Sequence, residues 1–215
     1  MSGGNIHERQ FTDEEYEKHG ELEKAAIERI LGPMCEVTGH ALIPFELGGN
    51  VDMYYFPNAT EGTGFVTMEL IEPDGRGPKP NRIGTYELLM FSKHKLTKNI
   101  DVRDTNHPFN KIERRICSIL TSVGRYSYQA VLNPGDTCEV PLEGDSEYAC
   151  LVLDEYRKKG VHFEVGGCKC GILLCIEIFR EEMKYAMEKG SSGLLSKLKE
   201  AGYYPYSDLD RKSLI

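Results

Sequence analysis

The chain has 215 residues, a length that fits one large domain or two small ones. Hydrophobic residues make up 40% of the sequence, which is enough for a packed core and argues against a disordered chain. A formal net charge of −8 argues against nucleic acid as a partner, because an acidic surface repels phosphate. No stretch approaches the roughly 20 apolar residues of a transmembrane helix, and the N-terminus is too polar for a secretion signal. The seven cysteines are scattered along the chain, which is typical of reduced thiols. We therefore expect a cytoplasmic protein that does not bind membranes.

The first predicted element is a helix. We expect a disordered N-terminus over residues 1–11 and a single domain over residues 12–215. Thr12 and Glu15 have the spacing of a capping box, and Gly32-Pro33 predicts the end of the helix near Leu31. An apolar stripe at helical spacing is formed by Leu22, Ala26, Ile27, Ile30 and Leu31. Residues 34–44 then indicate an edge strand that Gly39 interrupts.

Three strands are predicted next, over Val51–Pro57, Phe65–Ile71 and Thr85–Phe91. Each is rich in β-branched or aromatic residues and is flanked by Gly, Pro, Asn or Asp. Because successive side chains alternate between the two faces of a sheet, Val51, Met53 and Tyr55 are expected on one face and Asp52, Tyr54 and Phe56 on the other.

Each of these strands carries one acidic residue: Asp52, Glu69 and Glu87. If the strands pair as a meander, the three carboxylates can project from one face, where they could bind a divalent cation or act as an acid/base pair. The alternative is that the three carboxylates lie apart on a sheet face that is partly exposed to solvent, or that each forms a hydrogen bond with a neighbouring Tyr or Thr side chain. A one-residue slip in register reverses the faces, so the sequence leaves both possibilities open.

The C-terminal half continues the alternation of helices and strands. An amphipathic helix is expected between Asn110, as its N-cap, and Gly124. Strands are predicted over residues 137–142, 148–153, 161–165 and 171–179. Helices are predicted over residues 179–189, with Phe179, Met183, Ala186 and Met187 inward, and 192–201, with Leu194, Leu195, Leu198 and Ala201 inward. The Tyr-rich tail that follows is expected to lie along the body.

No convincing catalytic or metal-binding motif is present. Cys168-x-Cys170, with His162 before it and Cys175 after it, is the best metal candidate, but the second ligand pair of a zinc site is missing and Cys175 has the opposite strand parity. Two thiols in a glycine-rich loop is the favoured interpretation. Ser196 and Lys199 match a Ser/Lys nucleophile spacing on the wet face of a helix. We expect no metal and no cofactor.

Several segments together resemble the suppressor-of-fused (SUFU) domain family. VDMYYFP followed by GFVTMEL resembles its "apolar-Asp-apolar-Tyr-apolar-Phe-Pro, then Val-Thr-Met" strand pair, and GTYELLMF resembles its Tyr-x-Glu-Leu strand. The C-terminal stretch from Gly171 is similar to its closing strand, its E-x-x-Y-A-x-x-x-G-S-x-x-L-L-x-x-L helix pair and its D-x-x-R-x-S tail. The resemblance covers roughly residues 20–215 and fits the bacterial single-domain type. It implies one α+β domain with a mixed, mostly antiparallel sheet covered by amphipathic helices.

The resemblance implies protein binding rather than catalysis. Animal members grip a short peptide of a transcription factor, and many bacterial members look like immunity or accessory proteins of toxin systems. We therefore expect a non-enzymatic domain that sequesters a protein partner, with a basic protein or a toxin as the candidates, as a monomer or homodimer. The expected binding residues are Asp52, Tyr54, Glu69 and Glu87. The alternative is a metal-dependent enzyme that uses Asp52, Glu69 and Glu87.

Overall fold

The computed structural model describes residues 11–97, 100–101, 103–142, 147–156 and 162–215. Almost all of the N-terminal segment that we expected to be disordered lies outside the described residues. The helices are α1 (Asp13–Leu31), α2 (Pro108–Ser127), α3 (Arg180–Lys189) and α4 (Ser191–Glu200), with a short 3-10 helix η1 (Phe45–Leu47). The strands are β1 (Thr38–Gly39), β2 (Met53–Phe56), β3 (Thr63–Val66), β4 (Thr85–Ser92), β5 (Thr137–Pro141), β6 (Tyr148–Glu155), β7 (Phe163–Val165) and β8 (Cys168–Ile178). The predicted α+β class is confirmed.

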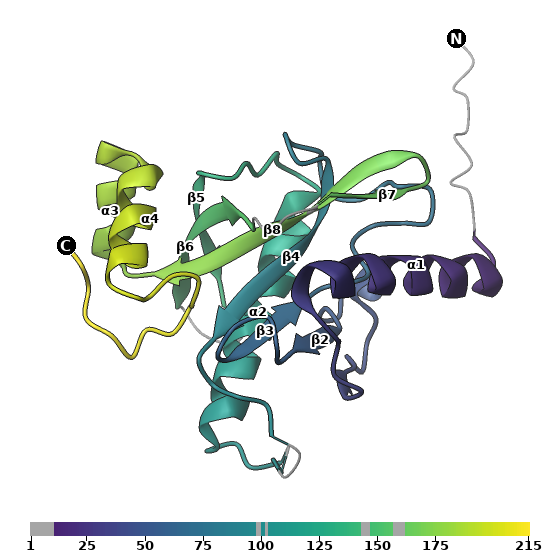
Figure 1. Cartoon of the computed structure of the whole chain (residues 1–215), viewed down its shortest axis with the longest axis horizontal. Coiled ribbons are helices and arrows are strands. Elements are labelled where there is room, and N and C mark those ends of the chain that lie inside the picture. Colours follow the sequence, from purple (N-terminus) through teal and green to yellow (C-terminus); the bar gives the residue numbers. More distant parts are fainter. Residues whose placement is uncertain (1–10, 98–99, 102, 143–146, 157–161) are drawn as a thin grey trace.

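One mixed sheet organises the molecule. Its strand order is β1-β2-β3-β4-β8-β6-β5, and β7 pairs with one end of β8. All of these pairs are antiparallel except β4 with β8. In Figure 1 the long strands β4 and β8 cross the centre of the molecule, α1 lies toward one end, and α3 and α4 lie at the other. Strands β1 and β5 are therefore the two ends of this strand order, and among the described residues no strand pairs with the outer side of either.

The sheet has an apolar core on each face. One core joins the sheet to α1, α3 and α4 through residues such as Ile27, Phe91 and Leu198. The other joins it to α2 through residues such as Tyr86 and Ile116. The predicted alternation is confirmed in β2, where Met53 and Tyr55 lie on the α2 face and Phe56 on the α1 face.

Two strand predictions were too long. Of residues 34–44, only Thr38 and Gly39 form a strand, and β3 ends at Val66 rather than at Ile71. Beyond Val66 the Thr67 N–H still donates to the Leu88 carbonyl oxygen, but the Thr67 hydroxyl accepts the Leu88 N–H in place of a backbone oxygen. The side chain of Glu87 on β4 then accepts the backbone N–H groups of Leu70 and Ile71. A buried carboxylate thus replaces the neighbouring strand as the acceptor for these amides.

The helix predictions also need correction. Helix α2 is capped by His107 and begins at Pro108, while the Asn110 side chain lies within the first turn and donates to the carbonyl oxygens of Asp101 and Asp104. The helix continues past Gly124 to Ser127. Three residues predicted to be inward, Leu22, Met187 and Ala201, are exposed. Cys168 and Cys170 lie at the start of β8 and not in a loop.

The C-terminal tail lies along the body, as predicted. The Ser207 N–H donates to the Phe91 carbonyl oxygen beside β4, and the Asp208 carboxylate accepts hydrogen bonds from the Ser92 hydroxyl at 2.6 Å and from the Lys93 N–H at 2.9 Å. Further along, the Arg211 guanidinium is bound in two places by the carboxylate of Glu182 on α3. The tail therefore ties the end of β4 to the helix pair.

Candidate protein-binding surface

Glu87 is fully buried beneath α1. Its carboxylate accepts hydrogen bonds from the Thr67 hydroxyl and, at 2.9 Å each, from the N–H groups of Leu70 and Ile71. Burial raises the pKa of Glu87 to about 8 even though these hydrogen bonds lower it. Its position is therefore that of a structural carboxylate and not of a surface contact.

Glu23 of α1 meets Glu87 across the helix–sheet interface, and the sequence did not single it out. Both Glu23 oxygens are buried, and no donor of the described residues lies within hydrogen-bond distance of them; His19 Nε2 is 3.6 Å from one oxygen. Burial, followed by the nearby Glu87, raises the pKa of Glu23 well above its ordinary value. Both raised pKa values favour a proton retained by the pair and used in a hydrogen bond between the two carboxyl groups. The sequence could have indicated this burial, because His19 and Glu23 continue the apolar stripe of Ala26, Ile27 and Ile30 at helical spacing and so lie on the same face of the helix.

Asp52 and Glu69 come together at the start of β2. The Asp52 carboxylate accepts hydrogen bonds from His40 Nδ1 at 2.7 Å and from the Ala41 N–H at 2.8 Å, and a Glu69 oxygen accepts the Asp52 N–H. Burial raises the pKa of Glu69 to about 7, and the Asp52 charge adds to the effect. Burial, followed by the charges of Asp52 and Glu69, raises the pKa of the half-buried Tyr54 to about 12. The structure thus brings three of the four predicted binding residues together and places Glu87 beneath them.

A divalent cation is expected to leave the melting temperature of the protein nearly unchanged. Within the described residues, no group of three or more His, Cys, Asp and Glu side chains is arranged to hold a metal ion. The Asp52 carboxylate is already occupied by His40 and the Ala41 N–H. Differential scanning fluorimetry with Mg²⁺ or Mn²⁺ should show a shift below about 1 °C. A rise of several degrees that disappears in Asp52→Asn would contradict this expectation and favour the metal-dependent alternative.

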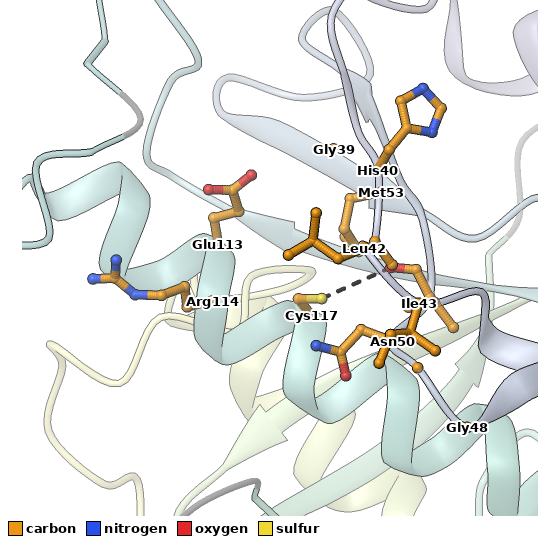
Figure 2. A pocket seen from close by; sticks show the side chains of 13 residues that line it. Gly39, His40, Leu42, Ile43, Gly48, Asn50, Met53, Glu113, Arg114 and Cys117 are labelled. Carbon is orange, nitrogen blue, oxygen red and sulfur yellow. Dashed lines mark hydrogen bonds between the residues drawn. The ribbon is translucent and has the colours of Figure 1, made fainter.

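A pocket of about 510 Å³ opens beside Asp52 at the β1 edge of the sheet. We call it the β1-edge pocket. Three segments surround it, as Figure 2 shows: the start of β2 with the loop that follows β1, the glycines after η1, and one side of α2. The lining side chains used below are His40, Leu42, Ile43, Met53, Glu113 and Cys117.

Helix α2 provides the polar part of this pocket. The Glu113 carboxylate accepts a short hydrogen bond from the Tyr55 hydroxyl, and no second hydrogen bond from the described residues reaches it. In Figure 2 the Glu113 side chain rises from α2, whereas the neighbouring Arg114 points away from the other lining residues. Arg114 instead donates to the Thr105 carbonyl oxygen at 2.7 Å. The Cys117 thiol lies deeper, 3.8 Å from the Val51 carbonyl oxygen.

The opposite edge of the sheet has its own shallow pocket. It has a volume of about 440 Å³ and lies between β5, the end of α2 and the α3–α4 turn. Tyr126, Val131 and Met187 expose apolar surface there. The outer strand β5 carries Glu139, which pairs with Arg180 of α3. Both open edges are thus bordered by exposed apolar side chains.

The cysteines and the Ser196/Lys199 pair that the sequence analysis considered do not form a catalytic or metal-binding arrangement in the described residues. Cys170 and Cys175 lie in the cores on opposite faces of β8, which confirms their opposite parity. Burial raises the pKa of the Cys170 thiol to about 12, so it is not an activated nucleophile. Lys199 lies 4.0 Å from Asp154 in a polar hollow that Ser196 also lines. The Lys93 ammonium lies over the rings of Tyr203 and Tyr206.

Comparison with known proteins supports the resemblance. A family model described as "Suppressor of fused protein (SUFU)" matches residues 55–212. No curated protein matches the chain.

Solved structures share the fold at low identity. A chain of the Sufu–Fu complex is 16% identical with a TM-score of 0.55, over 87% of this chain and 88% of that one. A SUFU homologue from Neisseria gonorrhoeae FA 1090 is 15% identical with a TM-score of 0.55, over 93% of this chain and 98% of that one. Suppressor of Fused from Drosophila is 15% identical with a TM-score of 0.54, over 84% of this chain, but the match covers only 46% of that longer chain.

Proposed function

Since the chain belongs to the suppressor of fused protein (SUFU) family, we propose that it is a non-catalytic domain that binds and sequesters a protein partner. The observation that carries this proposal is the family fold with two open sheet edges, each beside a pocket and exposed apolar side chains. An open edge presents unpaired backbone groups, which an extended segment of another protein can pair with as an added strand. A member of the same fold has been crystallised in a complex of Sufu with Fu, which supports a protein partner.

The partner is proposed to be basic. The net charge of −8 attracts cationic surfaces and speeds encounter with them. By analogy with the bacterial members of the family, we propose an immunity-like role, in which the domain neutralises a toxin in the cytoplasm as a monomer or homodimer. In the described residues no helix is long and apolar enough to cross a membrane.

A pull-down with the full chain from native host lysate is expected to recover one dominant basic protein at low salt. At 0.5 M salt the screening length falls to about 4 Å, so capture that depends on charge steering should be lost. Mass spectrometry identifies the captured protein, and light scattering over a concentration series gives the oligomeric state. Recovery of nothing specific at either salt concentration would contradict the proposal.

A further inference from the structure

We propose that the β1-edge pocket binds a short extended segment of a protein partner that places an apolar side chain next to a Lys or Arg. This inference rests on the proposed function and assigns a place and a chemistry to it. The pocket lies at the opposite side of the sheet from the β5 edge, so the two surfaces can be tested separately.

The apolar surface around the pocket is unusual for a surface loop. Four side chains between residues 37 and 47 are exposed although they are aliphatic: Val37, Leu42, Ile43 and Leu47. Leu42 is 102% exposed relative to an isolated residue, and yet Figure 2 shows its side chain directed across the pocket toward α2. A concentration of exposed aliphatic side chains beside a hollow is typical of a surface that a partner covers.

The adjoining backbone suits an extended ligand. β1 pairs with β2 through Thr38 and Gly39, and no strand among the described residues flanks its other side. Gly39 is needed at this place, because a Cβ atom there would lie 2.6 Å from the Tyr55 hydroxyl. A partner strand added outside β1 would run past the pocket mouth and direct alternate side chains toward it.

The charge of this region favours a basic segment. Residues 30–75, which contain β1, β2, β3 and the pocket loop, include seven Asp or Glu residues and no Lys or Arg. On the α2 side, Glu113 and Arg114 both line the pocket, but the Arg114 side chain turns away to the Thr105 carbonyl oxygen. The nearby Arg125 donates to the carbonyl oxygens of Gly48 and Gly49. The carboxylate of the pocket lining is therefore that of Glu113, which a Lys or Arg beside the apolar anchor would meet.

The loop that lines the pocket is held in place before any ligand arrives. Asp52 fixes His40 and Ala41 on one side, and Arg125 fixes Gly48 and Gly49 on the other. A loop fixed in this way loses less conformational entropy on binding than a free one. Asp52, which the sequence indicated as a binding residue, thus supports the pocket wall.

The test uses a phage-displayed library of random eight-residue peptides, panned against the full chain. Enriched peptides are expected to combine an aliphatic residue with an adjacent Lys or Arg. Their affinities are then measured by fluorescence anisotropy for the wild type and two variants. Leu42→Asp should weaken binding at least about tenfold, because it removes an apolar contact without disturbing the core. Glu113→Gln, which keeps an oxygen for the Tyr55 hydroxyl, should weaken binding about threefold.

Met187→Asp is the matched control, because it places the same charge on an exposed aliphatic position at the β5 edge. It should leave peptide affinity unchanged. Unchanged affinity in Leu42→Asp, or the absence of any enriched peptide, would overturn the pocket assignment. Loss of binding in Met187→Asp alone would also overturn it while retaining the proposed function at the β5 edge. Failure of the proposed function itself would appear separately, as an empty pull-down.

Discussion

Replacing Arg211 with alanine is expected to lower the free energy of unfolding by about 3–5 kcal/mol, the usual cost of leaving one member of a buried ion pair alone. The Arg211 side chain is 4% exposed and that of Glu182 is not exposed at all. Two guanidinium nitrogens donate to the two Glu182 oxygens at 2.6 and 2.7 Å, and the guanidinium also lies against the rings of Phe179 and Tyr203. Without it a fully buried carboxylate would lose its counter-charge.

Urea denaturation at neutral pH measures this effect, with Arg180→Ala as the control. Arg180 also pairs with a carboxylate, that of Glu139, but the arginine side chain is 52% exposed in this case. The control should therefore unfold at nearly the wild-type midpoint, because water and salt screen exposed pairs. An equal decrease in the free energy of unfolding in Arg211→Ala and Arg180→Ala would show that burial of the ion pair does not determine how strongly the tail is attached.

The same ion pair has a pH signature. Burial would raise the pKa of Glu182, but the hydrogen bonds from Arg211 and from the Phe179 and Leu214 N–H groups outweigh burial and lower it. A carboxylate with a lowered pKa in the folded state contributes stability at neutral pH that is lost as the pH falls through its folded pKa. Acid should therefore detach the tail, and Arg211→Ala should remove this part of the acid sensitivity.

Local sequence rules predicted the frame of the fold. The capping box at Thr12 and Glu15 is present, and the uninterrupted strands Thr85–Ser92 and Tyr148–Glu155 were predicted to within two residues, because cap chemistry and strand composition are local properties. The errors arise where distant residues compete for backbone groups. Beyond β3 the Thr67 hydroxyl accepts the Leu88 N–H, and Glu87, 16 residues beyond Ile71, accepts the Ile71 N–H, so side chains take the place of the strand ladder.

The candidate site was predicted only in part for the same reason. Asp52 and Glu69 were chosen because they lie on neighbouring predicted strands, and they do meet. The alternation of side chains along the predicted strands placed Asp52 and Glu69 near one another, but it did not indicate which groups would form hydrogen bonds with them. The β1-edge pocket depends on α2, whose Glu113 is 61 residues from Asp52, so neither periodicity nor spacing could reveal it. Glu23 was overlooked because a carboxylate on a charged helix is usually solvated.

Glu23→Gln is expected to make the protein more stable than the wild type at pH 8 and about equally stable at pH 5. In the wild type, the buried Glu23–Glu87 pair holds a proton that the unfolded chain releases near the ordinary glutamate pKa of 4.5. The folded state then binds more protons than the unfolded state, so wild-type stability falls as the pH rises from about 5 toward 8. The slope for one proton is about 1.4 kcal/mol per pH unit. A glutamine amide donates to Glu87 without a titrating proton, so the contribution of Glu23 disappears, while that of Glu87, whose pKa is raised by its own burial, remains.

Urea denaturation at several pH values between 5 and 8 provides the measurement, and the difference between variant and wild type is the quantity of interest. Tyr54 and Cys170 near the pair have pKa values raised to about 12 and so do not titrate between pH 5 and 8, whereas Glu69, with a pKa of about 7, titrates in both proteins. Glu21→Gln, on the exposed face of the same helix, is the control and should follow the wild-type curve. Parallel curves for Glu23→Gln and the wild type would mean that no proton is shared. If the free energies of unfolding of Glu23→Gln and the wild type are equal at low pH and differ above neutrality, the pair between α1 and the sheet binds this proton in the folded state.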